Sequence, residues 1–146
     1  MFIGTEYKTP DSKGRLVIPS KYRKMAGTEE EGGGFYIVAG PGPYAILYTK
    51  SEWERIYEKV SRSSAPEGDL FDIRRQIFTR AEFLPVDKQG RIVLSAGLLS
   101  DLGLKQEVAI LGAGSHFEIW DKDRWEAYRK EKLNAQDPAL WRKFLG

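Results

Sequence analysis

The sequence repeats itself, and this repeat leaves few architectures open to the chain. Residues 11–18 read Asp-Ser-Lys-Gly-Arg-Leu-Val-Ile, and residues 87–94, 76 positions later, read Asp-Lys-Gln-Gly-Arg-Ile-Val-Leu. Residues 50–54 return as residues 122–126 with an offset of 72, so the copies differ in length by a loop after Gly27, where such changes are tolerated. A chain of this kind is expected to build one structural unit twice.

Each copy carries the signals of several short strands and a brief helix. In the first copy, Pro10 to Gly14 is a typical turn, and residues 21–26 predict one or two helical turns that end at Gly27. Segments rich in β-branched and apolar residues predict strands around residues 6–7 and at residues 15–18, 35–39 and 45–48. The second copy is expected to repeat this order of elements.

A longer helix is expected to follow the strands of each copy. Ser51 and Glu54 form a capping box that predicts a helix start at Ser51, and Asp123 with Glu126 predicts the same start in the second copy. Aromatic residues recur on these helices at helical spacing, and such residues more often pack than stack on bases. The residues interpreted in this way are Trp53, Tyr57, Trp125 and Tyr128.

Two further helices are predicted outside the repeated strands. A connecting helix is expected at residues 69–79, behind a flexible linker at residues 61–68. Pro138 opens a short C-terminal helix, because proline is favoured at the first helical position. The acidic run Glu29–Glu31 is interpreted as a solvated loop.

The two copies are expected to share one hydrophobic core. A four-stranded unit of roughly 45 residues is too small to close a core alone, since burial becomes marginal below about 60 residues. We therefore expect an α+β fold: a β-barrel-like core with a pseudo-two-fold repeat and helices packed outside it.

Composition excludes several classes of function. With 41% hydrophobic and 30% charged residues the chain is expected to fold as a soluble globular protein. No apolar run reaches about 18 residues and Met1–Gly4 carries no export signal, so a cytosolic location is expected, with no membrane partner. The chain has no cysteine and a single histidine, His116, which argues against catalytic triads, metal sites and cofactors. We expect no enzyme and no small-molecule substrate.

Charge is concentrated in one part of the first copy. The formal net charge is only +2, but between Lys8 and Lys24 the bases face a single acid, Asp11. Clustered basic residues of this kind are typical of a nucleic-acid-binding edge. The basic residues are Lys8, Lys13, Arg15, Lys21, Arg23 and Lys24.

The motif Asp-x-x-Gly-Arg occurs in both copies, as Asp11, Gly14 and Arg15 and again as Asp87, Gly90 and Arg91. Turn chemistry alone explains the Asp and the Gly, and the Arg can simply pair with the Asp. The neighbouring lysines of the first copy favour a second interpretation, in which the Asp orients an Arg for phosphates or guanine edges. Both interpretations stay open at this point.

These motifs make the sequence recognisable as similar to one family. The matching segments are Met1–Gly4, residues 11–23, residues 87–92 and residues 116–125, and the chain resembles the MraZ family from Met1 to about Lys132. The resemblance implies a double SpoVT-AbrB-like, swapped-hairpin fold and a ring of subunits. It also implies a nucleoid-associated repressor that binds short direct repeats in double-stranded DNA upstream of the operon for cell division and cell-wall synthesis.

The resemblance implies four segments. Residues 5–51 form the first SpoVT-AbrB-like repeat, residues 52–80 the linking helices, residues 81–124 the second repeat and residues 125–146 the C-terminal helices. The family's Asp-x-x-x-Arg signature falls on Asp11 with Arg15 and on Asp87 with Arg91.

The second copy departs from the first where the basic pair would stand. Gly97 and Leu99 replace Lys21 and Arg23, and Ser95 stands where relatives often keep a proline. We therefore expect Arg91 and Lys88 to contribute less to DNA binding than Arg15 and Lys13. An alternative function, from a different class, is a ring-forming scaffold whose basic rim meets an acidic partner protein.

Overall fold

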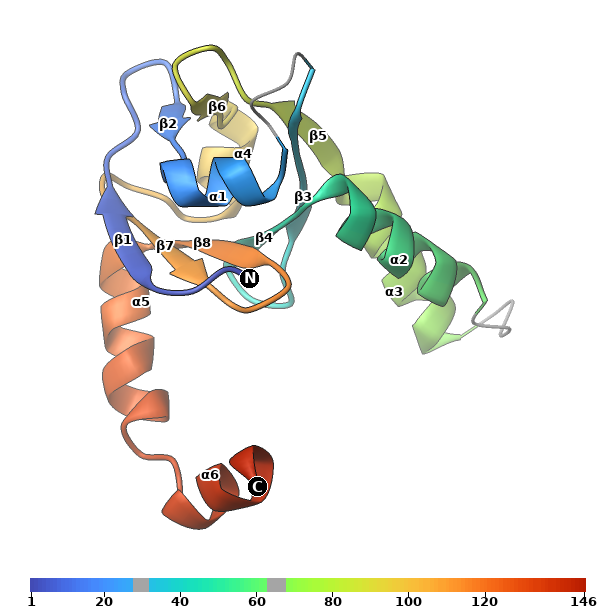
Figure 1. The fold of residues 1–146 in the computed structure, drawn as a ribbon, viewed down its shortest axis with the longest axis vertical. Coiled ribbons are helices and arrows are strands. Elements are labelled where there is room, and N and C mark those ends of the chain that lie inside the picture. The colour runs from blue at the N-terminus through green and yellow to red at the C-terminus, as the bar shows by residue number, and fades with distance from the viewer. Residues whose placement is uncertain (28–31, 63–67) are drawn as a thin grey trace.

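The computed structural model describes residues 1–27, 32–62 and 68–146 (Figure 1). Glu29–Glu31 and most of the expected linker at residues 61–68 lie outside the described residues. The fold is α+β, as expected. Its strands are β1 (Thr5–Lys8), β2 (Arg15–Val17), β3 (Gly34–Ala39), β4 (Tyr44–Tyr48), β5 (Glu82–Pro85), β6 (Arg91–Val93), β7 (Val108–Gly112) and β8 (Phe117–Asp121). Its helices are α1 (Ser20–Met25), α2 (Lys50–Ser61), α3 (Asp69–Arg80), α4 (Ala96–Asp101), α5 (Lys122–Tyr128), a π-helical continuation η1 (Arg129–Leu133) and α6 (Pro138–Leu145).

The strands form a six-stranded antiparallel sheet and a separate two-stranded ribbon. The sheet has the order β1-β7-β8-β4-β3-β5, and the ribbon pairs β2 with β6. Strand β1 of the first copy pairs with β7 of the second, and β5 of the second copy pairs with β3 of the first. The equivalent strands β4 and β8 pair with each other, as do β2 and β6. Each copy therefore completes the other, which is the pseudo-two-fold relation that the sequence repeat predicts.

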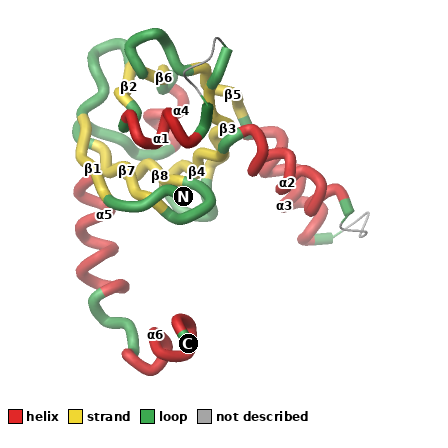
Figure 2. The backbone as a smooth tube through the Cα atoms, viewed as in Figure 1, coloured by secondary structure: helices red, strands yellow, loops and turns green. Residues whose placement is uncertain are grey.

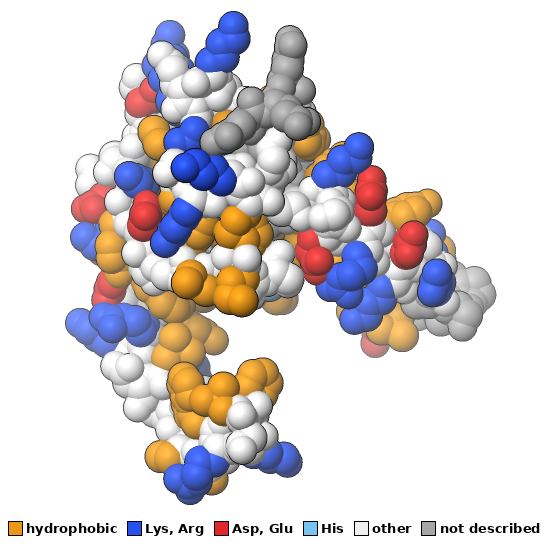
Figure 3. All heavy atoms as spheres, in the orientation of Figure 1, with side chains coloured by type: hydrophobic (Ala, Val, Ile, Leu, Met, Phe, Trp, Pro, Cys, Tyr) orange, Lys and Arg blue, Asp and Glu red, His pale blue; other side chains and the backbone are white. Residues whose placement is uncertain are grey.

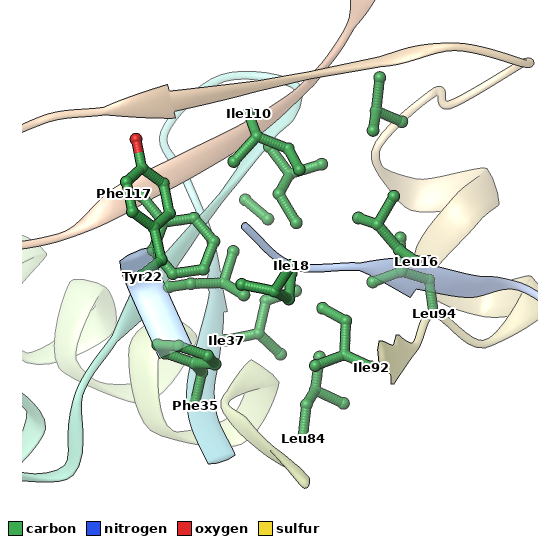
Figure 4. Close-up of a cluster of buried hydrophobic side chains, with 14 of the residues drawn as sticks. Leu16, Ile18, Tyr22, Phe35, Ile37, Leu84, Ile92, Leu94, Ile110 and Phe117 are labelled. Carbon is green, nitrogen blue, oxygen red and sulfur yellow. The ribbon is translucent and has the colours of Figure 1, made fainter. Parts of the chain in front are cut away.

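One core lies between the inner faces of the ribbon and the sheet, and both copies contribute to it. Leu16 and Phe35 from the first copy and Ile92 and Phe117 from the second are fully buried in one cluster (Figure 4). Phe35 and Phe117 meet edge to face across the copies, with ring centroids 5.0 Å apart. Burying a side chain of this size stabilises a fold by about 1.5–3 kcal/mol, and the side chains of this cluster come from both copies. The prediction of a shared core is confirmed.

The outer face of the sheet carries the longer helices (Figure 2). Trp53 of α2 stacks on Tyr36 of β3 with centroids 5.4 Å apart, and Phe78 of α3 packs against Trp53. On the second copy, Trp125 of α5 packs edge-on against Trp120 of β8. The packing interpretation of both tryptophans is confirmed, and α3 and α6 lie where the sequence predicted helices. Among the described residues, none of these helices is long and apolar enough to cross a membrane.

The predicted helix starts at Ser51 and Asp123 were each one residue late, since the helices begin at Lys50 and Lys122, and their caps lie two residues before the predicted ones. Helix α2 is capped by Thr49, whose hydroxyl accepts from the Glu52 amide at 3.2 Å. Helix α5 is capped by Asp121, which accepts from the Arg124 amide at 3.2 Å. The strands β4 and β8 run directly into these helices. The cap is therefore the residue that directly follows the end of the strand in β4 and the last residue of the strand in β8, because its side chain reaches the first helix amides. Ser51 and Asp123 lie further along the chain, inside the first turn.

Replacing Thr49 by alanine is expected to lower the free energy of unfolding by about 1 kcal/mol, because one helix amide loses its acceptor. Ser51→Ala, the matched control on the first turn of the same helix, is expected to change stability by less than about 0.5 kcal/mol. Urea denaturation of the two variants measures both values. Equal losses would show that Ser51 also caps α2.

Candidate nucleic-acid interface

The first Asp-x-x-Gly-Arg turn is organised by Asp11. Its Oδ1 accepts from the amides of Lys13 and Arg15, each at 2.9 Å, and its Oδ2 accepts from Arg15 Nε at 2.5 Å. The Gly14 amide donates to the Asp11 carbonyl at 2.9 Å and closes the turn. The carboxylate therefore fixes both the backbone of the turn and the direction of the arginine.

The second turn repeats this arrangement. Asp87 Oδ1 accepts from the amides of Gln89 and Arg91, each at 2.9 Å, and Oδ2 accepts from Arg91 Nε at 2.9 Å. The repetition at two places in one fold shows that the motif specifies a geometry. It also supports the turn-chemistry interpretation of Asp and Gly in both copies.

The two turns are tied to each other across the pseudo-two-fold. The Leu94 amide donates to the Gly14 carbonyl at 2.7 Å, and the Ile18 amide donates to the Gly90 carbonyl at 2.9 Å. Both glycines have positive φ, 76° at Gly14 and 80° at Gly90, which other residues rarely adopt. A Cβ at Gly14 would come within 2.2 Å of the Leu94 carbonyl oxygen, so this close approach needs glycine.

The register of the ribbon places both arginines on its outer face. Arg15 pairs with Val93 and Val17 pairs with Arg91, while Leu16 and Ile92 point into the core. Successive residues of a strand alternate between faces, and diagonal neighbours of an antiparallel pair lie about 7–8 Å apart. The outer face thus presents two arginines beside Val17 and Val93, which are 42% and 52% exposed. We call this surface, Arg15, Val17, Arg91 and Val93, the ribbon face.

The salt bridges leave part of each guanidinium available. Both Asp–Arg pairs use Nε, and the side chains of Arg15 and Arg91 are 34% and 25% exposed. Among the described residues, neither arginine has a protein partner at its Nη groups. A guanidinium held at Nε keeps its planar end free for two parallel bonds, the geometry that suits phosphate or the guanine edge.

The predicted lysines surround the ribbon face on different elements. Lys13 and Lys88 are exposed in the two turns, Lys21 and Lys24 are exposed on α1, and Lys8 is half-buried at the end of β1. Figure 3 shows Lys and Arg side chains gathered over the turns beside β2 and β6 and over α1. The structure therefore brings the basic residues of the first copy to one end of the molecule.

Arg23 is engaged within the fold. Its Nε donates to the Ile18 carbonyl at 3.0 Å, and its guanidinium lies so close to Gly90 that an added Cβ there would come within 2.5 Å of it. The side chain thus covers the turn of the second copy. In the second copy Leu99 stands at the equivalent position, so this cross-copy contact has no counterpart at Gly14.

Sequence reasoning did not single out four residues of this surface. Val17 and Val93 form the apolar part of the ribbon face, and Ser12 and Gln89 are exposed at the tips of the turns. The alternation of β2 and β6 indicated that one of each two residues faces outward. It did not indicate that the two strands pair with each other.

The pKa values of Asp11 and Asp87 lie below the ordinary value for aspartate. The largest cause is the hydrogen bond from the backbone amide of Arg15 or Arg91, and the arginine side chains lower the pKa further. A carboxylate with a depressed folded-state pKa contributes stability above its unfolded pKa and loses it as pH falls through the folded value. Both turns are therefore expected to weaken only below the ordinary range of an aspartate.

In a variant with both Asp11→Asn and Asp87→Asn, the free energy of unfolding is expected to fall less steeply as the pH is lowered, because the two titrating groups are gone. Urea denaturation at a series of pH values below 5 measures this decline. Asp101→Asn, at an exposed position on α4, is the control and should keep the wild-type slope. An unchanged slope in the double variant would contradict the assignment of acid sensitivity to the turns.

Comparison with known proteins matches both halves of the chain to one family. Residues 1–73 and 77–143 match the family described as "MraZ protein, putative antitoxin-like". The transcriptional regulator MraZ of Dictyoglomus thermophilum is 32% identical over 151 residues, which cover 98% of this chain and 100% of that protein. The proteins of the same name from Finegoldia magna and Photorhabdus laumondii are 36% and 35% identical, over 95% and 93% of this chain and 94% and 90% of their own lengths.

Proposed function

The chain belongs to the MraZ family, and from this premise we propose that it binds DNA in a sequence-specific manner through the ribbon face and regulates transcription. The family consists of transcriptional regulators, and the chain is not an enzyme. The proposal includes a repressor role at the operon for cell division and cell-wall synthesis. It also places the protein in the cytoplasm, on the nucleoid.

The observation that carries this proposal is the pair of arginines on one exposed ribbon. Each guanidinium is held at Nε by an aspartate of its own turn and keeps its Nη end available. A two-stranded ribbon is narrow enough to enter the major groove of DNA, where arginine pairs with guanine O6 and N7. Arg15 is assigned the main base contact, with Arg91 as a weaker second, and Asp11 and Asp87 orient them without touching DNA.

The lysines are assigned to the phosphates. Lys8, Lys13, Lys21, Lys24 and Lys88 are at least partly exposed around the ribbon face. Each phosphate neutralised releases condensed counterions, so the logarithm of affinity is expected to fall with the logarithm of salt at about 0.9 per contact. Arg23 supports the second turn and adds to the positive field of the same surface.

The strand pairing supports a finer description of the fold. We propose the swapped-hairpin, barrel-like organisation of a double SpoVT-AbrB domain, with repeats at residues 5–51 and 81–124, linking helices at residues 52–80 and C-terminal helices at residues 125–146. The reciprocal pairs β1–β7 and β5–β3 support this proposal, because each copy's first strand pairs with the other copy's third.

The proposal includes assembly into a ring. One ribbon face offers a small contact, but several subunits on one ring can engage direct repeats spaced about 10 base pairs, or one helical turn, apart. Linked weak contacts raise the overall affinity by effective concentration. The ring therefore explains how a ribbon with two arginines supports tight binding.

Mobility shifts with the DNA upstream of the protein's own gene test the proposal. With unlabelled competitor present, that fragment is expected to shift at a lower protein concentration than an unrelated fragment of equal length. Equal shifts would contradict sequence-specific binding and favour the scaffold whose basic rim meets an acidic partner.

A further inference from the structure

Two grooves on the outer face of the sheet are related by the internal repeat. One, of about 350 Å³, is lined by Ile46, Tyr48 and Trp53 of the first copy. The other, of about 550 Å³, is lined by Glu118, Trp120 and Trp125 of the second. Each residue of the second set lies 72 positions after its counterpart, so the two grooves are the same structural feature built twice.

The first groove is closed by a helix. Ile73 and Ile77 of α3 line it together with the sheet, and Phe78 of α3 packs against Trp53 and Tyr57 of α2. Helix α3 follows α2 in the chain and returns along it. The first copy therefore shows what covers this groove: an apolar helix beside the one that caps the sheet.

The second groove has no such helix among the described residues. Helix α5 and its continuation η1 run from Lys122 to Leu133, which matches the length of α2. The next helix, α6, is the counterpart of α3 in chain order, yet it lies at the far end of the α5–η1 arm, away from the sheet (Figure 1). In the part of the chain that the structure describes, no helix of the second copy takes the place that α3 has in the first.

Helix α6 has the chemistry to fill that place. Its large apolar side chains are in water: Leu140 is 56%, Trp141 59%, Phe144 92% and Leu145 75% exposed. Its last turn carries Arg142 and Lys143. The second groove is lined by one acidic residue, Glu118, and one basic residue, Arg124, and otherwise mainly by apolar and aromatic side chains, so the groove and α6 match in apolar surface.

We propose that α6 of one copy of this chain docks in the second groove of a neighbouring copy, in the position that α3 occupies beside α2. The arm supports a neighbour as the occupant, because it carries α6 off its own sheet. The hollow between Leu133 and α6, about 890 Å³, gives a docking partner a second apolar surface to cover. The groove and α6 are different surfaces, so the contact is head-to-tail, the kind of contact that builds a ring when the rotation between neighbouring copies closes. The inference rests on the ring in the proposed function and names the contact that builds it.

Disulfide trapping tests this contact without background, because the chain has no cysteine. The variant Leu140→Cys is mixed with a tagged variant Ala113→Cys, a residue exposed on the lining of the second groove. Oxidation is expected to give a mixed dimer whose mass identifies one chain of each kind. Tagged Ser100→Cys, on exposed α4, is the matched control and should give no mixed dimer above background.

Two results would overturn the proposal. Absence of the mixed dimer, in oxidant and with a longer thiol-reactive linker, would remove the second groove as the site. The second result concerns a chain that carries both cysteines. If it forms an intramolecular disulfide at high dilution, and the single-cysteine variants form no mixed dimer at any concentration, α6 covers the groove of its own chain.

A substitution separates assembly from DNA contact. Phe144→Glu places a charge on the docking face of α6 and is expected to lower the sedimenting mass towards that of one chain, while Phe144→Leu keeps the wild-type mass. An unchanged mass for Phe144→Glu would contradict the proposal. Arg15→Ala is expected to keep the mixed dimer while losing DNA binding, so failure of the docking contact and failure of the DNA contact are distinguishable.

Discussion

Arg15→Ala is expected to weaken specific DNA binding by about 1–3 kcal/mol for each subunit that engages a repeat. The side chain is held by Asp11 with its Nη end free of protein partners among the described residues, so the substitution removes a contact and leaves the turn amides bonded to the carboxylate. Titration of the upstream DNA at several salt concentrations measures both the affinity and its salt slope. Arg91→Ala is expected to have the milder effect, because the second copy lacks the basic pair of α1.

Arg55→Ala is the matched control for this prediction. Arg55 is an exposed arginine of α2 that pairs with Glu52 and is not part of the ribbon face, so its loss is expected to leave DNA binding unchanged. Asp11→Ala is expected to weaken binding indirectly, by freeing the arginine. Wild-type affinity and salt slope in Arg15→Ala would contradict the assignment of Arg15, and tighter binding by Asp11→Ala would show that the carboxylate only repels DNA.

Gly14→Ala is expected to lower the free energy of unfolding by about 2–4 kcal/mol. The substitution forces an L-residue into positive φ, which costs about 1–2 kcal/mol, and it drives a Cβ into the Leu94 carbonyl, which endangers a buried backbone hydrogen bond. Chemical denaturation measures the loss. The damage is expected in the ribbon, since the Gly14 carbonyl accepts from the Leu94 amide.

Gly90→Ala is the internal comparison, because the three atoms nearest to its Cβ would belong to the Arg23 side chain, whereas at Gly14 they belong to the Leu94 backbone. A side chain can move, so the loss is expected to be smaller than at Gly14 and to shrink further when Arg23→Ala is added. Equal losses at the two glycines, with no relief from Arg23→Ala, would contradict the asymmetry between the two turns.

The sequence repeat predicted the shared core, because a unit with so few apolar positions cannot bury them alone. Turn chemistry predicted both Asp-x-x-Gly-Arg turns, since carboxylate and glycine act on amides a few residues away. Contacts of this kind form between residues that are close together in the sequence. For that reason the motif residues Asp11, Arg15, Asp87 and Arg91 could be identified without coordinates.

Other features of the fold and of the site depend on contacts between residues that are far apart in the sequence, which a local sequence pattern does not indicate. The pairing of β2 with β6 joins residues far apart in the chain, so the ribbon face and its valines became visible only in the structure. The position of Arg23 against Gly90 has the same origin. The helix starts were misjudged for a different reason: the sequence pattern pointed to Ser51 as the cap, but strand β4 ends at Tyr48 and places Thr49 at the first helix amides.

Methyl resonances of the valines test most directly whether the ribbon face is the surface that meets DNA. Val17 and Val93 are exposed beside the two arginines, whereas Val60 lies on α2, away from the ribbon. Titration with a DNA fragment that carries the direct repeats is expected to shift the methyl signals of Val17 and Val93 and to leave Val60 unchanged. If saturating DNA shifted the methyl signal of Val60 and left the signals of Val17 and Val93 unchanged, the result would contradict the assignment of the ribbon face to DNA binding.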